Sequence, residues 1–158
     1  MAISLLHDYG QMNPDSRLLY LPQTSRYAVS AALYLASLPA GEYHMVEEIA
    51  ERTALSASYL AKILQRLSRI GVLDSRRGAK GGYRLRRPAA KITLSEIVAA
   101  SQRLDKSPMP CMIEARPCDS AKPCAMHQFV AETEGSLWRH LDTITLDNLG
   151  NTPHIQGD

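Results

Sequence analysis

Three cysteines and one histidine gather in a single short stretch near the C-terminal end of the chain. Cys111, Cys118, Cys124 and His127 follow one another with the spacing C-x6-C-x5-C-x2-H. Thiolates are soft ligands that suit iron–sulfur clusters, zinc or copper(I). A histidine can replace a cysteine as a ligand in some iron–sulfur centres. The spacing therefore predicts a metal centre held by the three thiolates, with His127 as the candidate fourth ligand.

Other interpretations of these four residues stay open. Zinc sites usually contain C-x2-C pairs, which this stretch lacks. The thiols could instead stay free or form a disulfide, and His127 alone could be an ordinary surface or core histidine. The N-terminus lacks the basic start and long apolar centre of a secretory signal, so we expect a cytoplasmic protein. Clustered cysteines in that compartment more often bind metal or sense redox state than form structural disulfides.

Positive charge is concentrated in one stretch of the chain. Ten Lys and Arg residues and a single acid, Asp74, lie between Lys62 and Lys91, for a net charge of +9. The whole chain carries only +2, so the remainder sums to −7. This asymmetry predicts a polyanionic partner. Duplex DNA fits best, because a helix fills its major groove while a basic ribbon reaches phosphates or the minor groove.

A helix begins the region that presents this charge. Ser56 can cap the free amides of a first helical turn, and Gly71 is a typical helix end. Apolar residues recur between them at helical spacing and define one face: Leu60, Ile63, Leu64, Leu67 and Ile70. A short helix is also expected from Val46 to Arg52, with a turn over residues 53–55. Two helices joined by a tight turn form a helix-turn-helix.

A β-ribbon follows that helix. Val72 and Leu73 begin a strand, residues 78–82 form a glycine-rich turn, and Tyr83 and Leu85 alternate with arginines. Helix, strand, turn and strand is the order of a winged helix. The alternative is an ordinary amphipathic helix beside a hairpin, with a solvated charged face.

The flanking segments complete the expected architecture. Thr24 is expected to cap a first helix that runs to about Leu38, and Thr93 with Glu96 forms a capping box before a helix that ends near Gln102. The buried face of the first helix is expected to contain Val29, Ala32, Leu33 and Ala36.

A long helix is expected from Ala125 to Asp142. Its apolar stripe consists of Met126, Phe129, Val130, Leu137, Trp138 and Leu141. A complete winged helix leaves little core for it to cover, so we expect it to pack on the same helix of a second copy. Such a homodimer would place two recognition helices at palindromic half-sites. The alternative is a helix that folds back on its own domain.

The expected fold class is mainly α with a small β wing, a winged helix-turn-helix domain plus a long C-terminal dimerisation helix. The expected segments are a flexible leader (1–19), a winged helix-turn-helix domain (20–103), a cysteine loop (104–124), a dimerisation helix region (125–149) and a disordered tail (150–158). No apolar run approaches the roughly 20 residues of a membrane span, so no membrane partner is expected. Nor is there a nucleophile elbow, a phosphate loop or a paired-carboxylate pattern, so the sequence does not indicate an enzyme.

Several motifs resemble a known family. They are S-R-Y-A-V in the first helix, I-A-E-R before the turn, L-S-A-S-Y-L-A-K-I-L, R-R-G-A-K-G-G-Y in the ribbon, and the cysteine loop. From about Leu19 to Leu149 the chain resembles the cluster-binding branch of the Rrf-two superfamily of bacterial winged-helix regulators. The resemblance implies a homodimer that binds palindromic promoter DNA and carries an iron–sulfur cluster, with [2Fe-2S] favoured over [4Fe-4S].

The resemblance also implies the ligand set Cys111, Cys118, Cys124 and His127. The first gap is one residue longer than in the branch that uses such a histidine, so a different loop geometry is expected. A nitric-oxide-sensitive branch instead uses an acid from the first helix of the other subunit, and Arg26 stands at that position here. The leader, longer than usual, could supply a ligand such as His7 or Asp8.

DNA contacts are expected from the recognition helix and the wing. Ser56, Ser58, Tyr59 and Lys62 lie early in the helix and are expected to face bases or nearby phosphates, although Tyr59 could equally pack in the core. Phosphate contacts are expected from Arg66 and Arg69. At the wing tip, Arg77 and Lys80 are expected at the minor groove.

These features together predict a DNA-binding transcriptional regulator, expected to be a repressor. Its promoter affinity would be controlled by an iron–sulfur cluster that senses iron, redox or nitric oxide status. The alternatives are a cluster-free regulator that senses redox state through thiol and disulfide, and a zinc-stabilised DNA-binding regulator.

Overall fold

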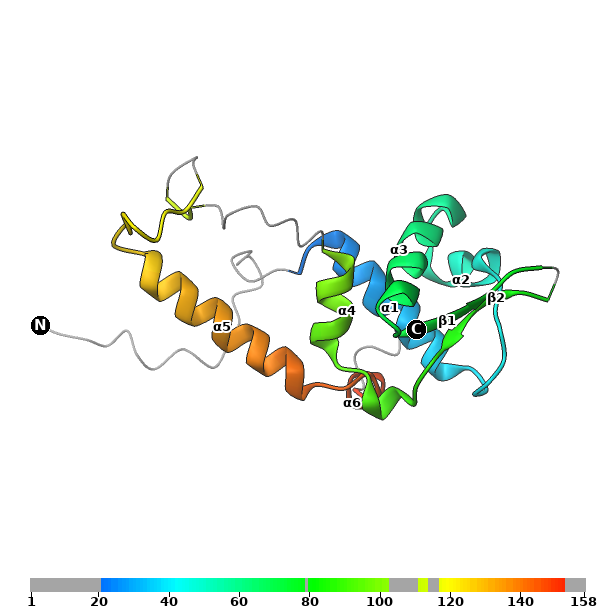
Figure 1. Ribbon diagram of the computed structural model, residues 1–158. Coiled ribbons are helices and arrows are strands. Elements are labelled where there is room, and N and C mark those ends of the chain that lie inside the picture. Colours follow the sequence, from blue (N-terminus) through cyan, green and yellow to red (C-terminus); the bar gives the residue numbers. More distant parts are fainter. Residues whose placement is uncertain (1–20, 79, 103–110, 114–116, 153–158) are drawn as a thin grey trace, which may run out of the picture.

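The computed structural model describes residues 21–78, 80–102, 111–113 and 117–152. The expected leader, much of the cysteine loop and the end of the expected tail lie outside the described residues. The helices and strands, in chain order, are α1 (Gln23–Ser37), α2 (Val46–Thr53), α3 (Ala57–Arg69), β1 (Leu73–Arg76), β2 (Gly82–Leu85), the 3-10 turn η1 (Ala89–Lys91), α4 (Leu94–Ser101), α5 (His127–Thr143) and α6 (Leu146–Gly150). The fold class is confirmed, because the described chain is mostly helical with a two-stranded antiparallel wing (Figure 1).

The main hydrophobic core lies where α1, α2, α3 and α4 meet. The recognition helix α3 buries Leu60, Ile63, Leu64 and Leu67, as its apolar spacing predicts. Ile70 departs from that prediction and is 48% exposed. The reason is that α3 ends at Arg69, so Ile70 leaves the helical register as the cap residue.

Local capping signals mark the starts of α3 and α4. The Ser56 hydroxyl accepts from the Tyr59 amide at the start of α3, and both bonds of the Thr93–Glu96 capping box are present in α4. The expected Thr24 cap is wrong, because Pro22 occupies the cap position and α1 begins at Gln23, two residues earlier than expected. Thr24 therefore lies inside the first turn, where its hydroxyl is 2.9 Å from the Tyr59 hydroxyl.

The buried face of α1 is rotated relative to the expected one. It consists of Ser25, Ala28, Ala31, Ala32 and Leu35. Of the four residues expected on this face, only Ala32 is fully buried. Val29, Leu33 and Ala36 are partly buried beside the core. Small side chains on this face let α1 approach α3 and α4 closely.

The wing is joined to the segment before the helix-turn-helix. Strands β1 and β2 pair in the register Leu73↔Leu85 to Arg76↔Gly82. On the other side of β2, His44 and Tyr83 exchange two backbone hydrogen bonds of 3.0 and 2.9 Å. Gly82 lies at this junction with φ +133, and a Cβ atom there would be 2.1 Å from the His44 carbonyl oxygen. Glycine is therefore required for the wing to approach so closely.

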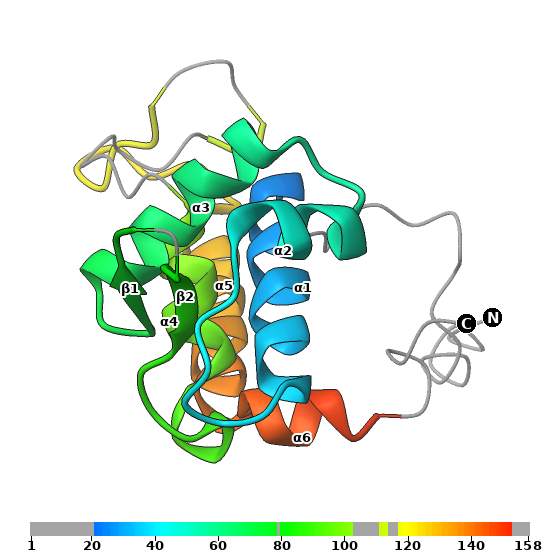
Figure 2. The same cartoon turned by 90° about the vertical axis from the view of Figure 1, so that its right-hand side faces the viewer.

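The C-terminal helices leave the main body and return to it. Helix α5 extends away from the other helices, whereas α6 lies back against them (Figures 1 and 2). Hydrogen bonds from the Leu94 amide to the Ile144 carbonyl (2.8 Å) and from the Leu146 amide to the Ile92 carbonyl (2.9 Å) fix the return. Buried Leu146 then joins the main core. Sequence reasoning anticipated no separate helix here. None of the helices in the described ranges is long and apolar enough to cross a membrane.

Candidate DNA interface and cysteine pocket

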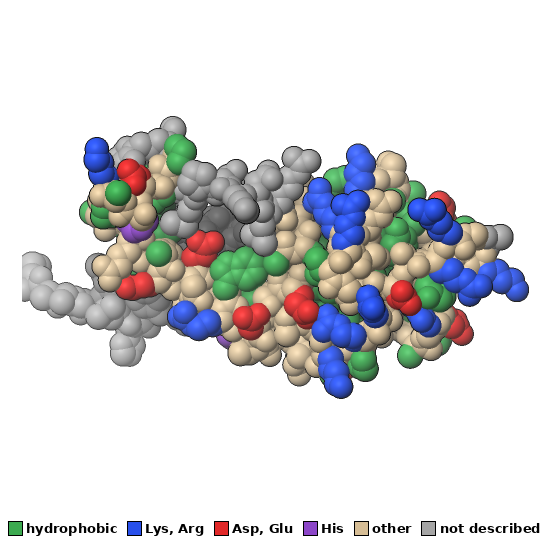
Figure 3. Space-filling view, in the orientation of Figure 1, with side chains coloured by type: hydrophobic (Ala, Val, Ile, Leu, Met, Phe, Trp, Pro, Cys, Tyr) green, Lys and Arg blue, Asp and Glu red, His purple; other side chains and the backbone are tan. Residues whose placement is uncertain are grey.

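The outer face of the recognition helix carries exposed polar and basic side chains. Ser58, Lys62 and Arg69 of α3 are all exposed. Ser56 is exposed as well, although its hydroxyl is engaged in capping the helix. Figure 3 shows Lys and Arg side chains gathered over the winged-helix end of the molecule. The structure thus places these four expected contacts together on one accessible helix.

Two of the expected DNA contacts are engaged within the protein itself. The Tyr59 ring packs edge-on against Tyr27 with 6.1 Å between centroids, and its hydroxyl lies beside Thr24. Arg66 is half-buried, and its Nη1 donates to the carbonyl oxygen of Ser101 at 3.1 Å. Both side chains therefore hold α3 in place, a role that helical spacing alone could not show.

The wing contains a charged cluster that sequence reasoning missed. The Arg84 guanidinium stacks 4.5 Å from the centre of the Tyr43 ring and donates to Asp74 Oδ2 at 3.0 Å. The Tyr43 hydroxyl donates to the same oxygen at 3.0 Å. Hydrogen bonds from Arg84 and Tyr43 hold the pKa of Asp74 below its ordinary value. Tyr43 precedes β1 by the whole helix-turn-helix, so no local sequence pattern signals this cluster.

This cluster separates the arginines of the wing by role. Arg84 is neutralised by Asp74, its cross-strand partner, and also donates to the Gly41 carbonyl oxygen. Arg77 and Lys80 flank the turn and are exposed. Arg84 therefore stabilises the wing, whereas Arg77 and Lys80 are exposed cations at its tip.

The cysteines and the histidine line a common pocket. Cys111, Cys118, Cys124 and His127 surround it, and Met112, Met126 and Val130 supply its apolar walls. All three thiols are half-buried, and His127 is the first residue of α5. Cys118 Sγ lies 2.8 Å from His127 Nδ1, within hydrogen-bonding distance. The structure thus brings together the four residues that the spacing singled out.

The pocket is lined by donor types that bind soft metal ions or iron–sulfur clusters. Within the described ranges, no three His, Cys, Asp or Glu side chains converge closely enough to hold one metal ion. A [2Fe-2S] cluster takes four ligands, two on each of its two irons. Three thiols and an imidazole around an apolar pocket are a fitting donor set for such a cluster.

A helix-turn-helix with a basic outer face and a hairpin wing defines a winged-helix DNA-binding protein. Residues 21–152 match the family model of Rrf2, described as an iron-dependent transcriptional regulator. The chain therefore belongs to the Rrf2 family of transcriptional regulators. Members of this family bind DNA, usually as dimers, and are not enzymes.

Solved structures agree with this assignment. The oxidised form of CymR from Staphylococcus aureus is 26% identical, with a TM-score of 0.66 over 85% of this chain and 98% of that one. IscR from T. potens is also 26% identical, with a TM-score of 0.66 over 89% of this chain and 93% of its own. CymR, the global cysteine regulator of B. subtilis, is 23% identical with a TM-score of 0.65 over 84% and 97% of the two chains, and shows the shared fold.

Proposed function

We propose that this regulator controls its promoter affinity through an iron–sulfur cluster held by Cys111, Cys118, Cys124 and His127. The observation that supports this most directly is the common pocket that all four residues line. When bound, the cluster would supply a group that responds to iron supply, oxidants or nitric oxide, and [2Fe-2S] is favoured over [4Fe-4S]. The family description as iron-dependent supports the same proposal.

The DNA contacts in this proposal come from two places. Ser56, Ser58, Lys62 and Arg69 on the exposed face of α3 enter the major groove or meet its flanking phosphates. Arg77 and Lys80 at the wing turn reach the neighbouring minor groove or its phosphates. Tyr59 and Arg66 contribute by fixing α3 to the rest of the fold.

The active form in this proposal is a homodimer formed through α5. Phe129 and Leu137, two large apolar side chains of α5, are 60% and 39% exposed. A second copy of α5 would cover both. Twofold symmetry would then place the two recognition helices at palindromic half-sites, where the regulator acts as a repressor.

The cluster can control the promoter only if the cluster-loaded and cluster-free forms differ in DNA affinity. Cluster-loaded and cluster-free protein must differ in the arrangement of the two recognition helices, because a ligand shifts an equilibrium only by its differential affinity for the two states. His127 begins α5, so its side chain is placed to report the state of the pocket to the proposed dimer helix.

Anaerobic reconstitution tests the proposal. Wild-type protein should bind iron and sulfide, show visible charge-transfer absorption, and change its DNA affinity when the cluster is removed. Cys118→Ser should lose the cluster and lock the protein in the affinity of its cluster-free form. Ser120→Ala, an exposed neighbour in the same loop, is the matched control and should behave as wild type. A colourless, iron-free wild-type protein after reconstitution would exclude the cluster.

One observation favours a second candidate function. The 2.8 Å approach of Cys118 Sγ to His127 Nδ1 is a geometry that supports thiolate chemistry, and one similar structure is the oxidised form of CymR. In this case the protein is a cluster-free thiol sensor. Iron-free protein would then change its DNA affinity on treatment with peroxide and regain it with a thiol reductant.

A further inference from the structure

A hydrogen bond ties the recognition helix to the start of the cysteine loop. Nη1 of Arg66 in α3 donates to the carbonyl oxygen of Ser101 at 3.1 Å. Ser101 is the last residue of α4 and only 2% exposed. Beyond it, the chain continues through Gln102 into the segment that leads to Cys111. Arg66 therefore bonds to the last residue of α4, just before the cysteine loop.

Buried polar groups hold Ser101 in place from other directions. Its hydroxyl lies 2.8 Å from the hydroxyl of Ser25 in α1 and 2.8 Å from the carbonyl oxygen of Val98 in its own helix. Ser25 is fully buried. Because a buried polar group is costly to leave without a partner, this junction of α1, α3 and α4 favours one arrangement over intermediate ones.

The charge of Arg66 suits this position. The last carbonyl groups of a helix lack helical partners and carry the negative end of the helix dipole. A guanidinium on the Ser101 carbonyl satisfies one of them and interacts favourably with that dipole. The contact is therefore directed at the end of α4, and a shift of the last turn of α4 would move or break it.

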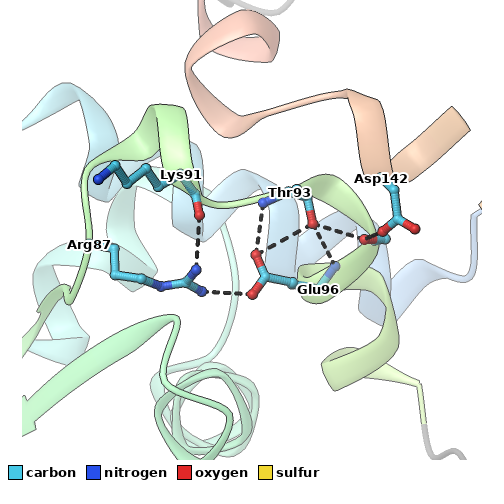
Figure 4. Close-up of polar contacts among 6 residues, drawn as sticks. Arg87, Lys91, Thr93, Glu96 and Asp142 are labelled. Carbon is cyan, nitrogen blue, oxygen red and sulfur yellow. Dashed lines mark hydrogen bonds and ion pairs between the residues drawn. The ribbon is translucent and has the colours of Figure 1, made fainter. Parts of the chain in front are cut away.

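The C-terminal end of α5 contacts the opposite end of α4. Figure 4 shows Asp142 of α5 beside the start of α4, where Ser95 donates a hydrogen bond to its carboxylate. Glu96 there accepts from the Thr93 amide at 2.9 Å and from Arg87 at 2.7 Å. These contacts hold the start of α4, whereas the contact with Arg66 lies at its end. In the described part of the chain, Arg66 thus provides a direct side-chain link between α3 and the root of the loop.

We propose that Arg66 is a positioning residue that couples the state of the cysteine loop to the orientation of the recognition helix. This rests on the proposed cluster control of promoter affinity. In this mechanism, filling the pocket alters the last turn of α4, and α3 follows through the bond between Arg66 and Ser101. Arg66 makes no phosphate contact in this mechanism.

Three variants separate this role from a phosphate contact. Arg66→Met removes the hydrogen bond and keeps much of the side-chain bulk, and Arg66→Lys retains a donor. Arg69→Met is the matched control, because Arg69 is an exposed arginine on the same helix. For each variant, two quantities are measured: the ratio of DNA dissociation constants of cluster-free and cluster-loaded protein, and the slope of log Kd against log salt.

The expected results differ for the two arginines. Arg66→Met should bring the ratio to within about twofold of one and leave the salt slope unchanged, and Arg66→Lys should restore part of the ratio. Arg69→Met should reduce the salt slope by about one and keep the ratio. The proposal is overturned if Arg66→Met keeps the wild-type ratio and lowers the salt slope as a lost phosphate contact would.

A second measurement does not depend on iron. If wild-type protein assembles no cluster, the proposed cluster control fails, but the link itself is still tested by alkylating the loop cysteines with iodoacetamide. Amide hydrogen exchange in α3 should then change in the wild type and in Arg69→Met, and stay constant in Arg66→Met. The proposed link between the loop and α3 is overturned if alkylation leaves amide hydrogen exchange in wild-type α3 unchanged.

Discussion

The winged-helix unit (residues 21–102) and the arm (the described residues from Cys111 to Thr143) differ sharply in how they are packed. The core of the unit draws buried residues from α1, α2, α3, β1 and α4. Among the described residues of the arm, only Leu141 is buried. The arm packs on the unit near its C-terminal end, where Leu141 and the partly buried Trp138 lie against Leu94 and Val98 of α4. The unit therefore has a core of its own, whereas the other described side chains of the arm are exposed or only partly buried.

The two regions also differ in chemistry. The unit carries the ten basic residues from Lys62 to Lys91, and the arm carries the three thiols and His127. The residues proposed to contact DNA and those proposed to hold the cluster therefore lie in separate regions of the chain. This separation means that damage to one function should leave the other measurable, and the following predictions test it from the largest effect to the smallest.

Truncation of a core side chain in the unit should have the largest effect. Leu64 in α3 is fully buried. Leu64→Ala should lower the free energy of unfolding by about 2–5 kcal/mol, because it removes buried apolar atoms and leaves a cavity. Urea unfolding followed by circular dichroism measures it. The exposed neighbour gives the control, since Gln65→Ala should change stability by less than about 0.5 kcal/mol.

Truncation of an apolar side chain in the arm should affect association instead. Phe129→Ala should preserve helical content and raise the dimer dissociation constant by about 10–100-fold, because about 1.5–3 kcal/mol of apolar burial is lost between copies. Sedimentation equilibrium measures this constant. Gln128→Ala alters the adjacent exposed residue and should leave it unchanged. Equal dissociation constants for wild type and Phe129→Ala would remove α5 as the dimer surface.

The wing offers a comparison of two glycines within the unit. Gly82 and Gly78 both have positive φ, so alanine at either position should cost about 1–3 kcal/mol of backbone strain. Only at Gly82 would the new Cβ meet the His44 carbonyl, while Gly78 has open space around it. Gly82→Ala should therefore destabilise more and weaken DNA binding more. Identical losses would mean that the junction of His44 and Tyr83 does not hold the wing.

The smallest effect is expected at the start of α4, and it depends on pH. Burial raises the pKa of Glu96, but hydrogen bonds from the Thr93 amide and Arg87 outweigh it and leave the pKa below the ordinary value of 4.5. The stabilisation is therefore present above that value and is lost as the pH falls through the lower folded pKa.

Glu96→Gln should thus cost about 1 kcal/mol of unfolding free energy near neutral pH, the scale of a lost helix cap. The gap between wild type and variant should close between about pH 5 and pH 3. Urea unfolding at a series of pH values measures it, with Glu47→Gln on the exposed side of α2 as the control. A gap that widened toward acid would contradict the direction of the shift.

Features set by neighbouring residues were predictable from the sequence. The Ser56 cap, the Thr93–Glu96 capping box, the Gly71 helix end and the apolar spacing of α3 are all signals within a few residues, and the structure contains each of them. Helix α6 was missed although Thr145 caps it through the Asn148 amide, because five residues with one buried side chain have no readable period. The rotated face of α1 also depends on which helices pack against it.

For the candidate site, the spacing singled out Cys111, Cys118, Cys124 and His127, and the structure places all four around one pocket. Their role as cluster ligands stays a prediction. Three side-chain contacts could not be predicted from the sequence. They are the hydrogen bond between Cys118 and His127, the stacking of Arg84 on Tyr43, and the hydrogen bond from Arg66 to the Ser101 carbonyl. Each depends on how distant segments meet in space, which local patterns do not encode.

The backbone exchange between His44 and Tyr83 bears on how the proposed DNA contacts are spaced. It bonds β2 at the base of the wing to the residues directly before α2. In the proposed dimer, this bond would keep the base of the wing beside the helix-turn-helix in each copy. Operators of different length would then be accommodated by the spacing between the two copies.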